Sequence, residues 1–360
     1  MMLHGGDVYG AAAKTGIPQE KLKDFSANLS PLGVPEGIFR AINDELVKVV
    51  HYPDPMSRRL REAIAASDGV SPEHIICGCG AADIIYRFVY GVQPKRALLL
   101  EPTFVEYEEA LSVIGAEVEG YPLNRKDFKI REDILEYMTE GLDVVFICTP
   151  NNPTGVVTEK NLLLKILEKA RLTNTILVLD ECFLDFLEDE KRYSLVRELD
   201  KYDNLLILKS FTKMFSIPGV RLGYGLCSNK NIMERLYKAG QDWSVSTMAE
   251  AAGIAALKEK EYVKKVIQYV NKERKYMESA LEQMGISYIH GAANYMLIYK
   301  ENCPDLYDQL LERGIILRKC SNYRNLTNDY YRIAINRHED NAALMEALYE
   351  ICGTYLNRCV

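Results

Sequence analysis

Five short apolar runs in this chain each end at a turn built from glycine, proline or polar side chains. The runs cover residues 74–77, 97–100, 143–148, 176–179 and 205–208. Runs of this length and composition are typical of strands buried in a sheet. Stretches with helical apolar spacing lie between them, for example residues 60–66 and 161–170. Strands that alternate with helices in this way predict an α/β fold.

The residues that follow these runs carry the chemistry of a candidate site. Gly80, Phe104, Asn152, Asp180 and Lys213 each come shortly after a run. Ligands of open α/β sheets bind outside the carboxyl ends of the strands. We therefore expect these five residues to gather along one edge of the sheet.

Lys213 stands in the stretch LLILKSFTKMFSIPGVRLGYG at residues 205–225. An ammonium group held among Phe211, Met214 and Phe215 loses hydration, which favours the neutral amine. A neutral amine is suited to form a Schiff base with a carbonyl compound. A solvated loop lysine is the alternative interpretation.

Two segments supply groups that suit a phosphate ester. Ser210, Thr212 and Arg221 offer two hydroxyls and a forked guanidinium near the lysine. The glycine turn GCGAAD at residues 78–83 leads into a helix expected to begin near Ala81. The free N–H groups and the dipole of such a helix favour an anion.

The same glycine turn has a second interpretation. A strand, a G-x-G turn, a helix, the strand 97–100 and then Glu101 together mimic a dinucleotide-binding unit. Asp83 stands where that fingerprint has its third glycine. A nicotinamide enzyme is therefore an alternative.

Asp180 directly follows the apolar run ILVL. A carboxylate at this point is partly desolvated, which is costly unless it meets a cation or a hydrogen-bond donor. A protonated pyridine nitrogen is such a partner, and a helix N-cap is the alternative role. Asn152, in TPNNPTG at residues 149–155, offers an amide donor at the carboxyl end of another strand.

The S-x-T-K motif that ends at Lys213, followed eight residues later by Arg221, resembles the cofactor-lysine motif of fold-type I pyridoxal phosphate (PLP) enzymes. These enzymes belong to the class I/II aminotransferase superfamily, and the resemblance covers nearly the whole chain. It implies PLP as the cofactor and a large domain, residues 36–258, with a mostly parallel seven-stranded sheet between helices. It also implies a small α+β domain, residues 259–360, joined by an N-terminal arm, residues 1–35.

The resemblance implies a role for each residue of the cofactor site. Lys213 would carry the cofactor covalently, and Asp180 would keep the ring nitrogen charged so that the ring acts as an electron sink. Phe104 would stack on the ring with Tyr107 behind it, and Asn152 would donate to the ring oxygen. The cofactor phosphate would bind the backbone of Gly80, Ala81 and Ala82, the side chains of Ser210, Thr212 and Arg221, and Tyr52 reaching across a dimer interface.

Substrate contacts follow from the same resemblance. Arg332 lies in the apolar segment YYRIAIN and needs an anionic partner. The family matches it to the arginine that binds the substrate α-carboxylate, whereas a structural Asp or Glu is the alternative. RKCSNYRNL at residues 318–326, with Arg318, Lys319 and Arg324, suits a substrate phosphate or forms a solvated basic loop. The expected substrate-binding residues are His4, Asn28, Asn152, Arg318 and Arg332.

Two branches of the superfamily fit the sequence, histidinol-phosphate aminotransferase and L-threonine O-3-phosphate decarboxylase. Phe183 stands where many aminotransferases have a tyrosine that bonds the ring oxygen, and HGG at 4–6, DFSANLSPLG at 24–33 and CSNY at 320–323 resemble the decarboxylase branch. We therefore expect a lyase that decarboxylates L-threonine O-3-phosphate, or a close phospho-amino acid, in cobalamin-type biosynthesis. An aminotransferase similar to the histidinol-phosphate branch is the alternative. A PLP-binding domain without turnover is a third interpretation, although it would usually lack Lys213 or Asp180.

Composition limits the partners. The chain has 360 residues with 48% hydrophobic content, enough for two domains. Its net charge of -7 does not favour binding to nucleic acid or to an anionic membrane. Its nine cysteines form no CxxC pair and no histidine cluster has zinc spacing, so we expect reduced thiols and no metal. The absence of a leader-like or membrane-spanning apolar segment predicts a cytoplasmic protein, and the family implies a homodimer.

Overall fold

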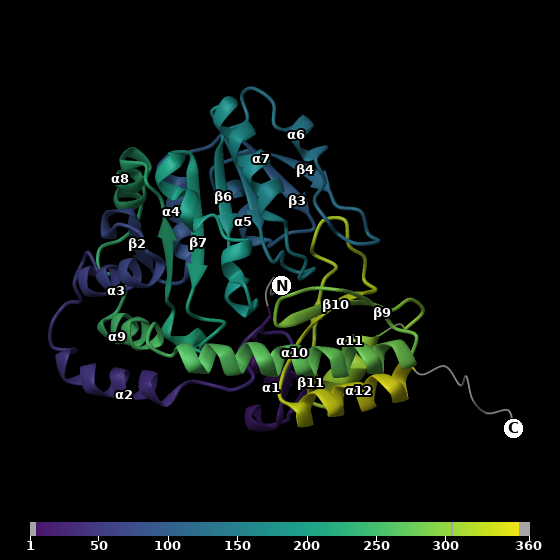
Figure 1. Ribbon diagram of the computed structural model, residues 1–360. Coiled ribbons are helices and arrows are strands. Elements are labelled where there is room, and N and C mark those ends of the chain that lie inside the picture. Colours follow the sequence, from purple (N-terminus) through teal and green to yellow (C-terminus); the bar gives the residue numbers. More distant parts are fainter. Residues whose placement is uncertain (1–4, 304, 353–360) are drawn as a thin grey trace, which may run out of the picture.

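A seven-stranded sheet forms the centre of the larger part of the molecule (Figure 1). The computed structural model describes residues 5–303 and 305–352. In spatial order the strands are β2 (Ile75–Gly78), β8 (Gly223–Leu226), β7 (Leu205–Ser210), β6 (Ile176–Asp180), β5 (Val144–Cys148), β3 (Arg96–Glu101) and β4 (Glu117–Pro122). β8 runs antiparallel to β2 and β7, and the other adjacent pairs are parallel. The predicted α/β class with a mostly parallel seven-stranded sheet is confirmed.

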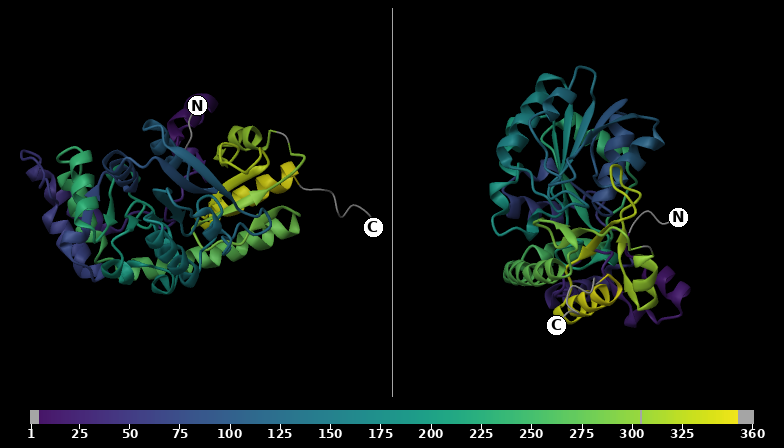
Figure 2. Two further views of the ribbon diagram at one scale, coloured as in Figure 1. Left: turned by 90° about the horizontal axis from the view of Figure 1, so that it is seen from above. Right: turned by 90° about the vertical axis from the view of Figure 1, so that its right-hand side faces the viewer.

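Helices cover both faces of this sheet, as the edge-on view shows (Figure 2). The helices of the larger part are α2 (Glu36–Glu45), α3 (Arg58–Asp68), α4 (Ala81–Val92), α5 (Glu106–Val113), α6 (Ile134–Tyr137), α7 (Lys160–Leu172), α8 (Lys230–Ala239) and α9 (Thr247–Ala256), of which α2 packs on α9 and not on the sheet. Buried apolar residues recur at helical spacing, for example Leu163, Ile166 and Leu167 of α7. Within the described ranges no helix is long and apolar enough to cross a membrane.

The strand order excludes the dinucleotide-binding interpretation. In a dinucleotide-binding unit the strands before and after the first helix are parallel members of one βαβ unit. Here β2 lies at an edge of the sheet and pairs only with the antiparallel β8, while four strands separate it from β3. Glu101, at the end of β3, instead forms an ion pair with Arg324. The nicotinamide alternative is therefore wrong.

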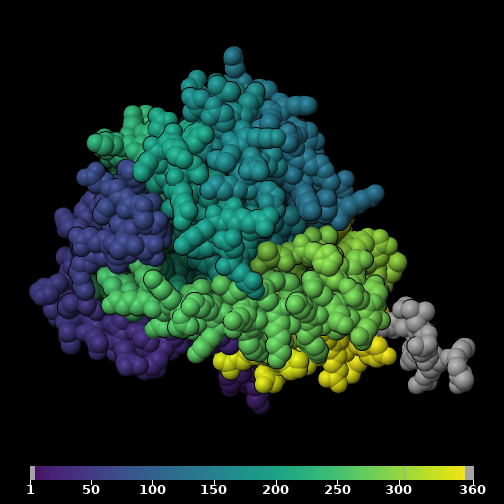
Figure 3. Space-filling model, in the orientation of Figure 1, coloured from purple at the N-terminus to yellow at the C-terminus, as the bar shows by residue number. Residues whose placement is uncertain are grey.

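A second, smaller sheet is built from the C-terminal part of the chain. Its strands are all antiparallel, in the order β12 (Arg318–Lys319), β13 (Tyr330–Ala334), β10 (Tyr295–Tyr299) and β9 (Ser287–Ile289). Two helices, α11 (Leu306–Glu312) and α12 (His338–Cys352), accompany it. The 24-residue α10 (Lys260–Gln283) runs along one face of the molecule from the larger part to this sheet (Figures 1 and 3).

The N-terminal arm joins this smaller unit. It contains α1 (Val8–Thr15), which the sequence did not predict, and β1 (Lys23–Asp24), which pairs in parallel with β11 (Ile315–Ile316). Asp7 caps α1 by accepting a hydrogen bond from the Gly10 N–H at 2.8 Å. We propose that residues 1–35 and 259–360 form the small domain and residues 36–258 the large one, and the β1–β11 pairing supports this division.

One charged side chain is buried within the apolar strand β7. Lys209 Nζ lies 3.7 Å from Glu181 Oε2 and 3.7 Å from Asp185 Oδ1. Glu181 directly follows β6. Burial acts to lower the pKa of Lys209, but the carboxylates of Asp185 and Glu181 outweigh it and raise this pKa above its ordinary value. The lysine therefore stays charged, and its attraction to these acids holds the ends of β6 and β7 together.

We expect that Gly253→Val destabilises the protein by about 1–3 kcal/mol, because overpacking strains a filled core. A Cβ at Gly253 of α9 would lie 2.6 Å from Leu222 Cδ2 and 2.8 Å from Leu60 Cδ1. Urea unfolding measures the change. Gly219→Val is the control, since a Cβ there meets nothing within 4 Å. Equal stability of the two variants would contradict this account of α9 packing.

Candidate active site

A cavity of about 640 Å³ lies at the carboxyl ends of the parallel strands of the large sheet. The structure places all five residues that follow the apolar runs, Gly80, Phe104, Asn152, Asp180 and Lys213, on its wall. The arm contributes Asn28, and the smaller sheet contributes Arg318 and Arg332. The site is thus built from both parts of the molecule.

Asp180, the last residue of β6, is a buried carboxylate held from two sides. Its Oδ2 accepts a hydrogen bond from the Tyr107 hydroxyl at 2.5 Å, and its Oδ1 accepts one from the Cys182 N–H at 2.9 Å. Burial and the charge of Asp180 raise the pKa of Tyr107 well above its ordinary value, so its hydroxyl remains a donor. These bonds fix a carboxylate on the cavity wall, where it can accept a hydrogen bond from a cationic ring nitrogen.

Lys213 follows β7 in a short loop and faces the same cavity as Asp180. Its Nζ lies 3.4 Å from Ser210 Oγ and 5.7 Å from the centre of the Phe183 ring. Its backbone carbonyl accepts a hydrogen bond from the Ser30 N–H at 2.9 Å, which ties the loop to the N-terminal arm. The amine and the acid that the sequence singled out therefore share one cavity.

The N-terminus of α4 forms the end of the cavity that suits an anion. Gly80, with φ +87°, turns the chain into α4, and a Cβ at this position would lie 2.9 Å from Arg221 Nη2. Ala81 and Ala82 line the cavity and occupy the first turn, whose N–H groups have no partner within the helix. Thr212 and Arg221 also line it.

Ser210 lies behind the wall that Thr212 and Lys213 form. It is buried, and its Oγ accepts hydrogen bonds from the Thr212 N–H at 3.2 Å and from Lys213 Nζ at 3.4 Å. Its described contacts are thus with the lysine loop itself. The hydroxyl that the sequence offered for a phosphate orients this loop in the present structure.

Arg332, from β13, forms the opposite end of the cavity. Its Nη1 donates to Asn152 Oδ1 and its Nη2 donates to the Ser26 carbonyl, both at 2.6 Å. These partners are neutral oxygens, and among the described residues the Arg332 Nε has no hydrogen-bond partner. The structural Asp or Glu considered as an alternative is not among its partners. A buried guanidinium without a carboxylate suits an anionic ligand.

Asn28 and Asn152 also present amide groups to the cavity. Asn28 is buried, and within the described chain its Oδ1 has no hydrogen-bond partner. The Oδ1 of Asn152 accepts from Arg332 and, at 3.3 Å, from the Tyr323 hydroxyl. The Asn152 amide nitrogen is therefore the group left to donate to a ligand. The unsatisfied oxygen of Asn28 and the unpaired Nε of Arg332 fit a bound polar molecule.

Only one of the three basic residues of the loop 318–326 lines this cavity. Arg318 donates to Asn322 Oδ1 at 2.9 Å and lies 5.3 Å from the Tyr323 ring centre. Lys319 instead lies 3.5 Å from Asp308 Oδ2, and Arg324 pairs with Glu101 and Glu108. Lys319 and Arg324 thus pair with acidic side chains outside the cavity, whereas the alternative interpretation of this loop expected solvated basic residues.

Tyr52, expected at the cofactor phosphate, lies away from the cavity of its own chain. Tyr52 is 80% exposed, does not line it, and packs against Trp243 with ring centres 4.7 Å apart. His4 lies outside the described residues. The neighbouring Gly5 and Gly6 do line the cavity, and the Gly6 N–H donates to Ser26 Oγ at 2.8 Å.

Sequence reasoning missed several groups of the site. Cys148 and Cys182 line the cavity, and the carbonyl of Ser26 binds Arg332. The position of Cys182, two residues after Asp180, was a usable sequence signal for the two cysteines. No sequence signal identifies a backbone carbonyl as the partner of a distant arginine.

The sequence matches the family described as aminotransferase class I and II over residues 20–348. It is 36% identical to threonine-phosphate decarboxylase of Salmonella typhimurium over 97% of this chain and 96% of that protein. It is 30% identical to the adenosylcobalamin biosynthesis bifunctional protein of Leptospira interrogans, over 97% of this chain and 41% of that protein. The crystal structure of histidinol-phosphate aminotransferase from Clostridium acetobutylicum matches with a TM-score of 0.86 and 30% identity, over 92% of this chain and 99% of that one.

We expect Cys148 and Cys182 to resist alkylation in the native protein. Burial, and next the charge of Asp180, raise the pKa of both thiols well above their ordinary value, so little thiolate exists at pH 8. Because thiolate is the nucleophile, iodoacetamide should modify them about 100-fold more slowly than in urea. Mass spectrometry of digests measures both rates. Native labelling as fast as labelling in urea would contradict the burial of this cavity wall.

Proposed function

Since the chain belongs to the aminotransferase class I and II family, we propose that it is a PLP-dependent lyase that decarboxylates L-threonine O-3-phosphate or a close phospho-amino acid. The similarity to threonine-phosphate decarboxylase, which extends over nearly the whole of both chains, carries this proposal. The similarity to an adenosylcobalamin biosynthesis protein supports a role in cobalamin-type biosynthesis. Such a pathway enzyme is expected in the cytoplasm.

The cavity residues fit the cofactor. When bound, PLP supplies an aldehyde that takes up the substrate amine and a ring that accepts the electron pair of a broken Cα bond. The Lys213 amine would hold it, and Asp180 would accept a hydrogen bond from the ring nitrogen and keep it protonated. The phosphate group would bind at the N-terminus of α4 with Thr212 and Arg221, where the glycine at position 80 leaves room.

Two arginines would hold the substrate by its two anionic groups. Arg332 has an unpaired donor and lies beside Asn152, which suits the α-carboxylate. Arg318, on the neighbouring strand β12, lines the same cavity and would bind the substrate phosphate. Binding at two points orients the substrate, and orientation decides the reaction, because only the Cα bond perpendicular to the cofactor ring is weakened.

Decarboxylation requires one bond to break and one proton to move. The bond from Cα to the carboxyl carbon breaks, carbon dioxide leaves, and its electron pair remains on the substrate side. The Lys213 ammonium, which faces the cavity, would then give a proton to Cα, yielding an O-phospho-aminopropanol. Phe183 offers no hydroxyl at the position where many aminotransferases have a tyrosine, and this difference supports the lyase.

An aminotransferase similar to the histidinol-phosphate branch is the second candidate. The crystal structure of such an enzyme matches this fold at a TM-score of 0.86 and 30% identity. In that reaction Lys213 would remove the Cα proton instead of donating one, and the carboxylate bound by Arg332 would stay in place. The same residues thus serve both reactions, and the products distinguish them.

A homodimer is part of this proposal. Five apolar residues of the segment 39–50 are exposed, among them Val47 and Val50 at 77% each, and Tyr52 follows directly. An exposed apolar patch of this kind is typical of a protein interface. A second copy covering this patch would take Tyr52 out of water. Tyr52 would then reach the cofactor phosphate of the partner, since it lies away from the cavity of its own chain.

The proposed reaction is tested with O-phospho-L-threonine and protein loaded with PLP. We expect carbon dioxide and O-phospho-aminopropanol, measured by a coupled assay and by mass spectrometry, and no turnover in Lys213→Ala. Arg318→Met should raise KM about 10- to 100-fold, because a hydrogen bond to a charged group is lost. Lys319→Met is the matched control, since Lys319 already pairs with Asp308. Pyridoxamine phosphate formed with glutamate, without carbon dioxide, would reject the lyase.

The role of Tyr52 is tested by mixing two variants. Tyr52→Phe should weaken PLP binding about tenfold through loss of a hydrogen bond to phosphate. Heterodimers of Tyr52→Phe with Lys213→Ala contain one site with both Lys213 and the partner's tyrosine. We expect that site to regain the affinity of the natural protein in a fluorescence titration. A monomer in sedimentation analysis, or no recovery in the mixed dimer, would contradict the exchange of Tyr52 between copies.

A further inference from the structure

A carboxylate lies unexpectedly close to the proposed phosphate site. Asp83 occupies the first turn of α4, three residues after Gly80. Its Oδ2 accepts a hydrogen bond from the Cys79 N–H at 2.9 Å, inside the glycine turn, and its Oδ1 accepts one from Arg87 Nε at 3.0 Å. The glycine turn, the carboxylate and the guanidinium therefore form one connected set of contacts.

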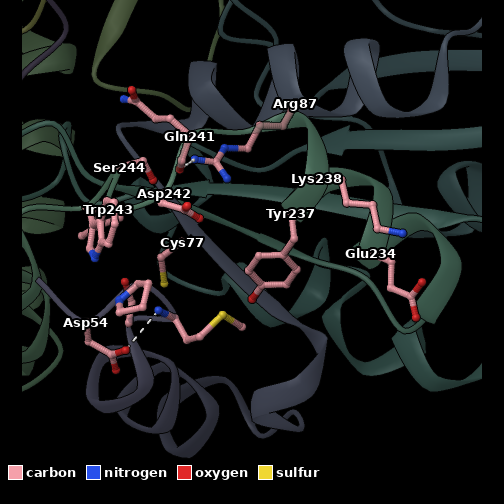
Figure 4. A pocket seen from close by; sticks show the side chains of 14 residues that line it. Asp54, Cys77, Arg87, Glu234, Tyr237, Lys238, Gln241, Asp242, Trp243 and Ser244 are labelled. Carbon is pink, nitrogen blue, oxygen red and sulfur yellow. Dashed lines mark hydrogen bonds between the residues drawn. The ribbon is translucent and has the colours of Figure 1, made fainter.

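The pair of Asp83 and Arg87 differs from a surface ion pair. The Arg87 side chain is only 5% exposed and that of Asp83 22%. Arg87 Nη2 also donates to the Gln241 carbonyl at 3.3 Å, beside a second cavity of about 350 Å³ (Figure 4). Removing one member of such a buried pair leaves an uncompensated charge, so the two side chains depend on each other.

Two glycines leave the space that this pair occupies. A Cβ at Gly240 would lie 2.0 Å from Arg87 Cζ, and a Cβ at Gly78 would lie 2.7 Å from Asp83 Oδ2. A side chain at either position would displace the pair. The packing therefore supports a fixed position for both groups.

Asp83 has two opposite effects on an anion bound at the start of α4. Its negative charge repels a phosphate group, and the positive charge of Arg87 offsets this repulsion. Its hydrogen bond to Cys79 holds the turn that precedes Gly80, and this turn sets the direction of the first N–H groups of α4. Because Arg87 offsets the charge of Asp83, we expect the second effect to be the larger.

We propose that Asp83 and Arg87 are positioning residues for the cofactor phosphate, an inference that rests on the proposed function. Neither residue touches the phosphate. Asp83 holds the turn 78–80 so that the Ala81 and Ala82 N–H groups face the anion. Arg87 holds Asp83 in place and neutralises its charge.

The test compares pyridoxal with PLP, which differ only in the phosphate group. The ratio of their dissociation constants, measured by titrating cofactor-free full-length protein and following absorbance, isolates the contribution of the phosphate site. We expect Asp83→Ala and Arg87→Met each to reduce this preference for PLP about tenfold, as loss of a charged hydrogen bond predicts. Pyridoxal binding itself should change little.

Asp83→Ala separates positioning from simple electrostatics. Removing the carboxylate alone leaves Arg87 unpaired, which raises the positive potential and would tighten phosphate binding. Loss of the hydrogen bond from the Cys79 N–H would weaken phosphate binding. Glu261→Ala and Lys264→Met are the controls, because these residues form an exposed pair at 2.6 Å on α10 and should leave the preference unchanged. If Arg87→Met does not fold, Arg87→Lys, which keeps the charge but loses the guanidinium fork, should show an intermediate loss.

Three results would overturn the inference. They are tighter PLP binding by Asp83→Ala, an unchanged preference in both variants, or an equal loss of pyridoxal and PLP affinity. Natural protein that binds PLP but does not decarboxylate O-phospho-L-threonine would contradict the proposed reaction and leave this test valid. Natural protein that binds neither compound would overturn both proposals.

Discussion

The buried carboxylate of Asp180 is the constraint on which the site depends. It ends the central strand β6, where water is excluded, and it is tolerated because Tyr107 and the Cys182 N–H donate to it. The neighbouring strand β7 leads to Lys213 on the same edge of the sheet. Directly behind this edge, Lys209 and Glu181 join the same two strands by charge. An acid and an amine are thus held on adjacent strands by the packing of the sheet itself.

The two ends of the cavity are lined by different parts of the molecule. The large sheet supplies the glycine turn and α4, and the smaller sheet supplies Arg332 and Arg318. Arg332 reaches across to Asn152 of the large part and to Ser26 of the arm. One guanidinium therefore connects three segments that are distant in sequence, and the cavity exists only where they meet.

The sequence was informative wherever a functional residue directly follows an apolar strand. Asp180, Asn152, Gly80 and Lys213 were found in this way, because a buried strand leaves a clear pattern and its end has a fixed place in an α/β fold. The sequence did not predict the role of residues that depend on a partner distant in the chain. The loop 318–326 shows three basic residues in sequence, but only the partners Asp308, Glu101 and Glu108 separate Lys319 and Arg324 from Arg318. Likewise, only the antiparallel β8 reveals that the glycine turn is no dinucleotide site.

The pairing of β1 with β11 has a consequence for the synthesis of this protein. The arm leaves the ribosome before the large sheet, whereas its strand partner and the strand that carries Arg332 are made after that sheet. Until then the arm has no edge to join, and the wall that Ser26 and Asn28 contribute is missing. Contacts so remote in sequence form late in folding. The nascent chain would therefore complete its large sheet well before it acquires a closed site, and ligand binding would begin only once both chain ends had come together.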